Sequence, residues 1–487
     1  MIYQTISDCA HEHPSKTAVV YNGDVISYAA FASAIDETCG DIETQTLPEG
    51  HTIVVRINCL MDCWVAVLAL QNLGFNTVCV SSVSVIEGLS LHSIGGIVTT
   101  EIEARIDPIE PDYIKKERII SIPNPTYSSG GPPLVRASKG KNGIGDHILY
   151  TSGTTGTYKK IVTSANQQKK RDAERIQQMH LSEDTVFYCS DYGLWTAVGY
   201  MLAPSTWKVN GCVILDQRPD WRRHFLHSGV TRAVLLPDKL NQLLSAMDDN
   251  TEMSSPENFT LYASGGFISR SLAQRILDRL TKNLFVSYGS TEVAIASLES
   301  KVTDLDDLHW LAPSPVRRVE IIDDSGAVCR INEEGYIRIR LEAQDCSSYL
   351  DNPQVSAKVF RDGFFYPGDM AVRRADGRIR MLGRSADVVN FRGQKYAVSP
   401  LEDNIQNLLG VEAACLFSGL NDAGEDEVVV AIEAEQWPDK SHLDLLGHEF
   451  AQFDQIRFAI IHPFPRTTTG TEKVNRAELR KLIFPGQ

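Results

Sequence analysis

The chain has 487 residues, which is too long for one ordinary hydrophobic core and predicts about two to four packed units. Apolar residues make up 43% of the sequence and charged residues 22%, a balance typical of soluble globular proteins. The formal charge of −15 argues against nucleic acid or an anionic membrane as the main partner.

The cysteines and the N-terminal stretch bear on the cellular compartment. Ten cysteines show no disulfide or zinc framework, and no His or further Cys cluster supports a metal site at Cys59 and Cys63. Reduced, mostly buried thiols are expected. The opening stretch MIYQTISDCAHEHPSK lacks the apolar segment of a secretory signal, and no apolar run is long enough to span a bilayer. The sequence predicts a cytoplasmic protein with no membrane partner.

The first 310 residues or so alternate between short apolar runs and helical patterns. The stretch 17–28 predicts a hairpin around Asn22-Gly23, and 51–57, 59–74 and 76–82 read as strand, helix and strand. Further strands are expected at 212–215, 232–236, 259–263 and 284–287, with a helix over 269–280. This alternation predicts an α/β fold of mostly parallel sheets covered by helices.

The pattern changes after about residue 312. The stretches 319–331, 335–341 and 370–382 alternate apolar and polar residues around DSG and DG turns, which predicts antiparallel hairpins in a small barrel-like sheet. From Ala386 onward a hairpin, helices and strands predict a compact α+β unit, and 136–145 reads as a surface loop. We therefore expect a large domain over 1–384 and a small, mobile C-terminal domain over 385–487.

The stretch YTSGTTGTYKKI at 150–161 is composed of small hydroxylic residues and glycines and ends in two lysines. Apolar runs flank it on both sides, so the loop is expected to join two strands, which excludes the usual P-loop that opens a helix. Glycine backbone N–H groups, threonine and serine hydroxyls and the Lys159 ammonium could together bind phosphate. A polar hairpin tip is the alternative that composition alone leaves open.

The order of residues in this stretch resembles the phosphate-loop signature of the adenylate-forming superfamily, which includes acyl- and aryl-CoA ligases, peptide-synthetase adenylation domains and luciferases. Four further stretches resemble motifs of that family in the family's order: YGSTE at 288–292, YPGD at 366–369, GRSADVVNFRGQKYAVSPLE at 383–402 and PRTTTGTEKVNRAEL at 465–479. The sequence departs from the family at Tyr158, Lys160 and Pro367 within these motifs. The resemblance covers almost the whole chain.

The resemblance implies ATP and Mg²⁺ as cofactors and a reaction in which a carboxylate attacks the α-phosphate to give an acyl-adenylate and pyrophosphate. A thiol of CoA, or of a carrier protein acting in trans, would then take the acyl group, as in enzymes of secondary metabolism. Glu292 would hold Mg²⁺, which prefers oxygen ligands; the alternative is a helix-start glutamate favoured by the helix dipole. Tyr288 would face adenine, and Thr291 would reach the α-phosphate.

The resemblance also assigns roles at the ribose and in the small domain. Asp369 would accept the ribose hydroxyls, and Arg384 would reach the ribose or phosphate side. Lys473 would be the catalytic cation beside Thr291 and Glu292, although two residues, Thr471 and Glu472, separate it from the glycine that precedes it in the family. The remaining ATP-binding residues implied are Thr151, Ser152, Gly153, Thr154, Thr155, Gly156, Lys159, Gly266, Gly289 and Ser290.

The small domain is expected to rotate between the two half-reactions. Ala386 lies at the implied hinge, where the family often has an acidic residue or lysine, and Asp387 follows it. Rotation would bring Lys473 to the site for the first step and the Gly393 hairpin for the thioester step.

The acid is expected to bind around two of these motifs. Asp191 falls where amino-acid-activating members of the family carry the aspartate that pairs with the substrate ammonium, and Trp195 follows at the same spacing. A buried carboxylate needs a cation or donors, so an amine-bearing acid such as an amino acid or an aminobenzoate would satisfy it. A solvated aspartate or a helix N-cap is the alternative. The other pocket residues implied are Gly265, Phe267, Ser287, Ile295 and Ala296.

Three functions remain open at this point. The first is a ligase that ends in a thioester, and the second is an enzyme that delivers the acyl group to an amine. The third, suggested by the insertion before Lys473 and by Ala386, is a catalytically weakened relative that only binds its ligand.

Overall fold

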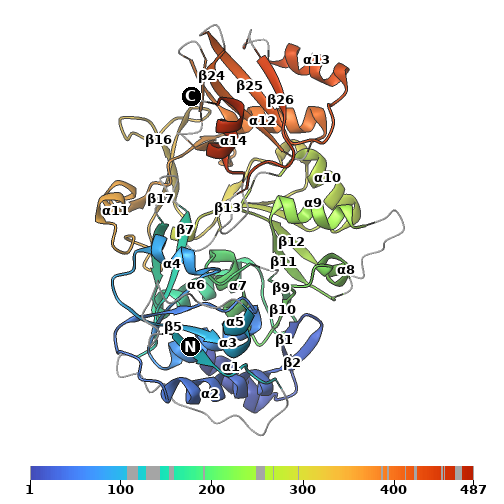
Figure 1. Cartoon of the computed structure of the whole chain (residues 1–487). Coiled ribbons are helices and arrows are strands. Elements are labelled where there is room, and N and C mark those ends of the chain that lie inside the picture. Colours follow the sequence, from blue (N-terminus) through green and yellow to red (C-terminus); the bar gives the residue numbers. More distant parts are fainter. Residues whose placement is uncertain are drawn as a thin grey trace.

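The computed structural model describes residues 2–106, 119–127, 143–152, 158–189, 192–226, 228–247, 258–266, 268–293, 296–384, 388–391, 394–411, 413–421, 425–450, 453, 456–466 and 474–485. The chain has a mixed α/β fold, as predicted (Figure 1). No helix in these ranges is both long and apolar enough to cross a bilayer.

The largest sheet has nine strands in the order β15-β14-β13-β12-β11-β9-β10-β1-β2. Its central strands, from β13 to β1, are parallel, and the strands at the two ends, β2, β14 and β15, are antiparallel to their neighbours. The bounds are β1 Thr17–Tyr21, β2 Asp24–Ser27, β9 Val186–Tyr188, β10 Cys212–Leu215, β11 Arg232–Leu235, β12 Thr260–Ala263, β13 Leu284–Gly289, β14 Ala296–Lys301 and β15 Ala312–Pro313. The predicted hairpin is confirmed, with Asn22 and Gly23 at φ 50° and 97°.

A six-stranded sheet in the order β6-β5-β3-β4-β7-β8 lies beside it, parallel except for the last pair. Its strands are β3 Thr52–Val55, β4 Asn76–Cys79, β5 Ile94–Thr100, β6 Ile119–Ile122, β7 His147–Ser152 and β8 Tyr158–Thr163. One hydrophobic cluster contains side chains of both sheets and of the helices α2 (Tyr28–Glu43) and α3 (Leu60–Asn72). Within it Phe31 and Trp64 both pack on Trp207, with ring centres 5.0 and 5.1 Å apart.

Helices connect the strands, as the alternation predicts. Their bounds are α1 Ile2–Glu12, α2 Tyr28–Glu43, α3 Leu60–Asn72, α4 Val83–Leu89, α5 Glu101–Ile106, α6 Ala165–Gln178, α7 Ala197–Trp207, α8 Trp221–Leu226, α9 Pro237–Ser245, α10 Arg270–Arg279 and α11 Pro353–Val359. The first turn of α6 is held by a capping box, in which Ser164 and Gln167 bond to each other's backbone N–H groups. This cap starts α6 directly after β8, so the helix packs close to the phosphate-loop hairpin.

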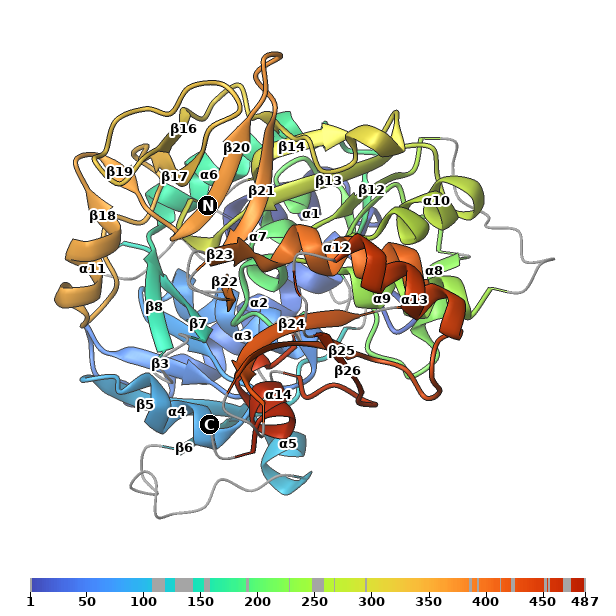
Figure 2. The same cartoon turned by 90° about the horizontal axis from the view of Figure 1, so that it is seen from above.

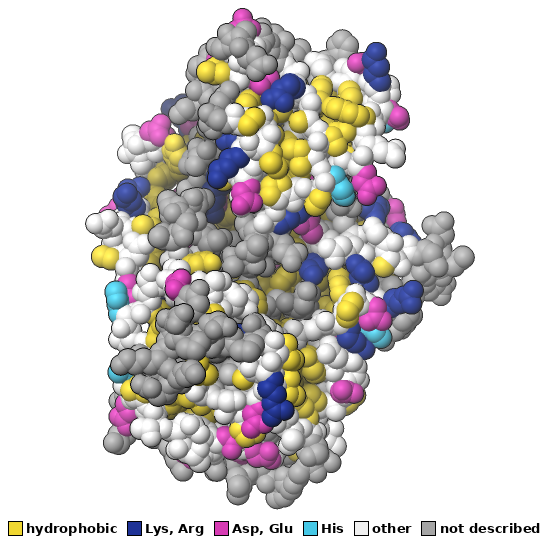
Figure 3. Space-filling model, in the orientation of Figure 1, with side chains coloured by type: hydrophobic (Ala, Val, Ile, Leu, Met, Phe, Trp, Pro, Cys, Tyr) yellow, Lys and Arg dark blue, Asp and Glu magenta, His cyan; other side chains and the backbone are white. Residues whose placement is uncertain are grey.

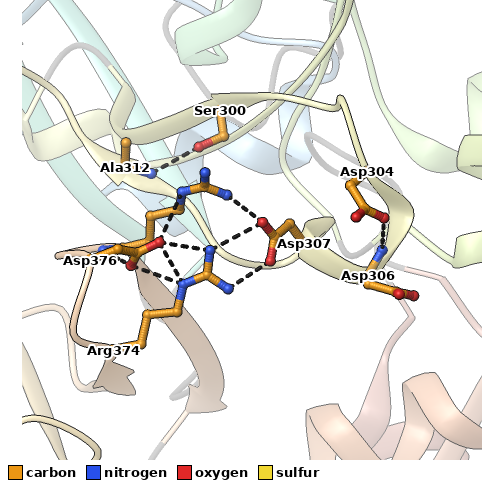
Figure 4. Close-up of polar contacts among 8 residues, drawn as sticks. Ser300, Asp304, Asp306, Asp307, Ala312, Arg374 and Asp376 are labelled. Atoms are coloured by element: carbon orange, nitrogen blue, oxygen red, sulfur yellow. Dashed lines mark hydrogen bonds and ion pairs between the residues drawn. The ribbon is translucent and has the colours of Figure 1, made fainter.

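The third sheet is small and antiparallel, as predicted for the region after residue 312. It consists of β16 Val319–Ile322, β17 Glu334–Arg340, β18 Phe360–Arg361, β19 Phe364–Phe365, β20 Asp369–Arg373 and β21 Ile379–Arg384. An ionic cluster ties it to the large sheet: Asp307 pairs with Arg374 at 2.6 Å and with Arg378 at 2.8 Å, while Asp376 closes the β20–β21 turn (Figure 4).

The residues after Arg384 form hydrophobic clusters of their own. They contain β22 Val388–Phe391, β23 Gln394–Ala397, α12 Val398–Leu409, β24 Ala414–Leu420, β25 Asp426–Ile432, α13 Lys440–Glu449, β26 Ile456–Ile460 and α14 Arg476–Ile483. Figure 2 shows α12 running across the top of the molecule towards α9 and α10. The expected α+β texture is confirmed, whereas the domain boundary at residue 384 stays a prediction.

Polar contacts between described residues join the C-terminal region to the rest of the chain. The carboxylate of Asp238 pairs with Arg466 at 3.3 Å. The backbone N–H of Arg270 donates to Asn407 at 3.0 Å, and the Asp403 carboxyl group lies 3.4 Å from His309. On the face shown in Figure 3, the described Lys and Arg side chains are dispersed among Asp and Glu, in keeping with the acidic net charge of −15.

Candidate active site

The phosphate-loop stretch folds as a hairpin, so the prediction that it joins two strands is confirmed. Strand β7 pairs antiparallel with β8, and Thr151 lies opposite Lys159 while Ser152 lies opposite Tyr158. Gly153, Thr154, Thr155 and Gly156 lie outside the described residues, as does the side chain of Ser152. The structure therefore defines where the loop enters and leaves, at the edge of the six-stranded sheet.

The YGSTE stretch ends strand β13 and opens into a short 3-10 turn over Thr291–Val293. Because β9, β11, β12 and β13 are parallel, their carboxyl ends lie at the same edge of the large sheet, which is where α/β proteins bind ligands. The Ser290 hydroxyl is buried and has no hydrogen-bond partner among the described residues. A buried hydroxyl without a partner is costly unless a ligand supplies one.

Glu292 is 7% exposed, and its carboxylate accepts a hydrogen bond of 2.6 Å from the hydroxyl of Tyr349. Burial and the neighbouring carboxylate raise the pKa of Tyr349, so its hydroxyl remains a donor. We call Glu292 and Tyr349 the Glu292 pair. Among the described residues, no lysine or arginine forms an ion pair with Glu292. The local carboxylate charge is therefore not neutralised by a protein cation in the described part of the chain.

The Tyr349 ring has a second neighbour from the phosphate-loop hairpin. The ammonium of Lys159 lies 5.5 Å from the ring centre, within the range of a cation–π contact. The adjacent Lys160 is buried and donates to Asp351 at 3.0 Å and to the Ser90 carbonyl at 3.2 Å. Lys160 replaces the glycine of the family pattern, and its buried contacts hold strand β8 against Ser90 and Asp351.

Asp369 begins strand β20 and lies opposite Arg384 at the end of β21. Its carboxylate is 8% exposed and accepts hydrogen bonds from Tyr288 at 2.5 Å and from the Arg384 guanidinium at 3.0 Å. Burial and the Asp369 charge raise the pKa of Tyr288. We call Tyr288 and Asp369 the Asp369 pair. The two motifs are therefore in direct contact, although 81 positions separate them in the chain.

The expected acid pocket is described in part. Gly265, at φ 80°, and Gly266 follow β12 and pack against Leu236 and Pro237, which follow β11. The Leu236 N–H donates to Tyr192, which brings the stretch after Asp191 to the same edge. Ser287 lies on β13 and Ala296 begins β14. These positions put the glycines and the 192–195 stretch at the carboxyl edge that carries Glu292.

The indole Nε1 of Trp195 is buried without a partner among the described residues. Gly193 lies directly against the indole ring, because a Cβ at this glycine would come within 2.1 Å of it. The N-cap of α7 is Thr196, so Asp191 does not cap that helix. Besides the loop residues 153–156, six predicted positions lie outside the described residues: Asp191, Phe267, Ile295, Ala386, Gly393 and Lys473.

Two contributors were not found from the sequence. Tyr349 lies 57 residues after Glu292 in a stretch without a recognised motif, and Tyr192 follows Asp191 directly. The sequence indicates only that a buried tyrosine needs a hydrogen-bond partner for its hydroxyl. The partner itself depends on long-range folding.

Magnesium and ATP are the groups that the fold family implies, and the residues present fit them. The buried Glu292 carboxylate has no ion-pair partner and the buried Ser290 hydroxyl no hydrogen-bond partner among the described residues, and Tyr349 links Glu292 to the phosphate-loop hairpin. Among the described residues, no three His, Cys, Asp or Glu side chains converge to hold a metal ion. That fits Mg²⁺, which is commonly held by one or two carboxylates together with substrate phosphates.

Comparison with known proteins defines the class. Residues 145–344 match the family described as AMP-binding enzyme. The matched residues form an AMP-binding domain, and the similar proteins and structures are adenylate-forming ligases, so the predicted resemblance is confirmed.

Individual relatives share this class at low identity. The D-alanine–D-alanyl carrier protein ligase of Lacticaseibacillus casei (strain BL23) is 22% identical over 432 residues, which cover 85% of this chain and 84% of that protein. Several other curated relatives are matched over less than two thirds of their own length.

Two solved structures have the same fold. The amide bond synthetase McbA from Marinactinospora thermotolerans superposes with a TM-score of 0.83 at 18% identity, covering 99% of both chains. O-succinylbenzoate coenzyme A synthetase (MenE) from Bacillus subtilis, in complex with ATP and magnesium ion, has a TM-score of 0.81 at 17% identity, covering 98% of this chain and 99% of that one. At these identities the structures show the shared fold.

Proposed function

We propose that this protein binds ATP with Mg²⁺, activates a carboxylic acid as its acyl-adenylate with release of pyrophosphate, and then transfers the acyl group to a pantetheine thiol of CoA or of a carrier protein. The observation that carries the first step is the buried carboxylate of Glu292 close to the Ser290 hydroxyl, which has no partner in the described part of the chain, next to the hairpin that holds Lys159. Such a group of one anion, one donor and one cation suits a metal-bound triphosphate.

In this proposal, one group of described residues binds the ribose of ATP and another binds its phosphates and Mg²⁺. At the ribose end, Asp369 would accept hydroxyl groups, since a carboxylate has about four lone-pair sites and its bonds to Tyr288 and Arg384 use only part of them. At the phosphate end, Glu292 would hold Mg²⁺, which neutralises phosphate charge when bound. Thr291 and Ser290 would donate to phosphate oxygens, and Lys159 would neutralise the charge on the leaving pyrophosphate.

The second proposed step needs the C-terminal region to move. We place the large domain at 1–384, the small domain at 385–487 and the hinge at Ala386. The three contacts of Asp238, Asn407 and Asp403 with the opposite region would then break when the small domain rotates. They are one ion pair, one hydrogen bond and one polar contact of a half-buried histidine.

The proposed acid carries an amine, which Asp191 would bind. The support is the relative that acts on D-alanine and the position of the stretch that follows Asp191 at the carboxyl edge of the sheet. ATP–pyrophosphate exchange over a panel of acids tests both parts. Exchange should occur with amino acids or aminobenzoates and be weak with their des-amino analogues, because an unpaired buried carboxylate costs several kcal/mol. Equal exchange with an acid and its des-amino analogue would remove Asp191 from the pocket.

A second candidate function is amide formation with an amine as the acceptor, which the fold similarity to McbA favours. The acceptor can be identified after adenylate formation by offering CoA, a phosphopantetheinylated carrier protein or a panel of amines. Thioester products would support the first candidate, and amide products the second. No exchange with any acid, together with retained ATP binding, would favour a weakened relative that only binds its ligand.

A further inference from the structure

We infer that Tyr349 is a positioning residue that fixes both Glu292 and Lys159 from one side chain. This inference rests on the proposed function, because it assigns Glu292 to the metal and Lys159 to the phosphates. The tyrosine hydroxyl donates to Glu292 at 2.6 Å, and the face of its ring lies 5.5 Å from the Lys159 ammonium. A single ring therefore sets the separation between the group for the metal and the group for the phosphates.

The backbone around Tyr349 is held firmly enough to act in this way. We call residues 344–351 the brace segment. Its N-terminal half is bound to α6, where Arg171 donates to the Gln344 carbonyl and Gln167 to the Asp345 carbonyl, both at 2.8 Å. The Asp345 carboxylate forms a buried two-point ion pair with Arg317. Four of its side chains are less than 9% exposed: Gln344, Asp345, Cys346 and Tyr349.

The brace segment also contacts both elements that it would align. Its Cys346 N–H donates to the Glu292 carbonyl at 2.9 Å, so the backbone of the metal-binding turn is held as well as the carboxylate. Its Leu350 N–H donates to the Lys160 carbonyl at 2.9 Å, on the strand that carries Lys159. The segment thus lies between the turn after β13 and strand β8.

Lys160 has a defined part in this arrangement. Successive side chains on a strand point to opposite faces, so Lys159 and Lys160 diverge from β8. The Lys160 ammonium is buried and pairs with Asp351, two positions after Tyr349, at 3.0 Å. The family glycine at this position would leave Asp351 without that partner. The lysine therefore anchors the end of the brace segment to the exit of the phosphate loop.

The expected effect concerns the coupling between metal and nucleotide. A group that orients a metal ligand typically contributes about ten- to a hundredfold to metal affinity or activity. Replacing Tyr349 by Phe removes the donor to Glu292 and keeps the ring for Lys159. The coupling is measured as the ratio of ATP dissociation constants, by calorimetry, in EDTA and in excess MgCl2. We expect Tyr349→Phe to reduce this ratio by about tenfold or more, with AMP affinity unchanged.

Tyr28→Phe is the matched control. Tyr28 is also a buried tyrosine, and its hydroxyl donates to the Gly211 carbonyl at 2.7 Å in the core formed with α2. Both substitutions remove one buried hydroxyl, so both should lower thermal stability, but only Tyr349→Phe should change the metal coupling. Tyr349→Leu removes the ring as well, and should weaken ATP in excess MgCl2 about two- to fivefold further, since the cation–π contact is lost.

Asp351→Asn provides a second variant at a partly exposed position, should Tyr349→Phe fold poorly. It loosens the anchor of the brace segment and should reduce the coupling about two- to fivefold. Wild-type coupling in both Tyr349→Phe and Asp351→Asn would overturn the inference and leave the proposed function intact. A wild-type protein whose ATP affinity does not depend on MgCl2 would instead overturn the proposed function, and the inference with it.

Discussion

The Asp369 pair and the Glu292 pair contain the same kind of hydrogen bond, from a tyrosine hydroxyl to a carboxylate, but they differ in their other partners. In each, a buried tyrosine hydroxyl donates to a buried carboxylate, at 2.5 Å for Asp369 and 2.6 Å for Glu292. Asp369 also has the guanidinium of Arg384 at 3.0 Å, whereas Glu292 has no such cation among the described residues. The ion pair with Arg384 suits Asp369 to hydroxyl groups, and a carboxyl group without such a partner in the described part of the chain suits a metal ion.

A half-buried carboxyl group, that of Glu299, has neither a tyrosine hydroxyl nor a guanidinium as its partner. Glu299 lies on β14 opposite Ser287 of β13, and a neutral amide, that of Gln178, hydrogen-bonds its carboxyl group. Burial raises the pKa of Glu299 to about 7. The hydrogen bond from the neutral amide of Gln178 does not offset the effect of burial on the pKa of Glu299.

The largest expected effect concerns Lys473, the proposed catalytic cation, which lies outside the described residues. Lys473 is assigned to the attacking carboxylate and the α-phosphate, and loss of one aimed donor typically costs about 10²–10³ in rate. Lys473→Ala should therefore slow adenylate formation by that factor, measured by pyrophosphate exchange. Transfer from a supplied acyl-adenylate should remain nearly intact, because the small domain is expected to have rotated.

Lys481→Ala is the control for this prediction. Lys481 lies in the last turn of α14, outside the motif, and should tolerate alanine. Wild-type exchange in Lys473→Ala would mean that Thr471 and Glu472 displace the lysine from the site.

The next largest effect is expected on ATP affinity when Asp369 is replaced. Asp369→Asn removes the charge while keeping one acceptor oxygen, and a charge-assisted hydrogen bond contributes roughly 1.5–3 kcal/mol. ATP affinity by calorimetry should fall about ten- to a hundredfold. Asp376→Asn is matched to it, because Asp376 also lies on the β20–β21 hairpin and pairs with Arg374 on the surface. Unchanged ATP affinity in Asp369→Asn would remove the Asp369 pair from the site.

The smallest effect concerns stability and pH. The unfolded Glu299 releases its proton near pH 4.5 and the folded one near 7, so the folded state binds more protons between these values. Stability should fall as pH rises through this window, by about 1–2 kcal/mol. Glu299→Gln should remove that loss, read from urea midpoints at about pH 5 and pH 8. Glu183→Gln, on an exposed side chain, should keep the wild-type difference; a Glu299→Gln protein that also keeps it would contradict the shift.

The sequence predicted the parallel sheets, the hairpin at Asn22-Gly23 and the antiparallel region after residue 312, because each depends on local periodicity and turn residues. It also placed Glu292 after a strand, whereas the ion pair between Asp369 and Arg384 comes from the structure. It did not predict the Tyr349–Glu292 bond or the burial of Lys160. Both depend on contacts between segments far apart in the chain, which no local pattern specifies.

The most direct measurement compares metal dependence in two variants of the two pairs. ATP dissociation constants of Glu292→Gln and Asp369→Asn are determined by calorimetry in EDTA and in excess MgCl2. Glu292→Gln should bind ATP equally with and without magnesium, whereas Asp369→Asn should bind ATP more weakly in both conditions and keep the wild-type dependence. If Glu292→Gln keeps that dependence, or Asp369→Asn loses it, the two carboxylates do not divide the site as the structure implies.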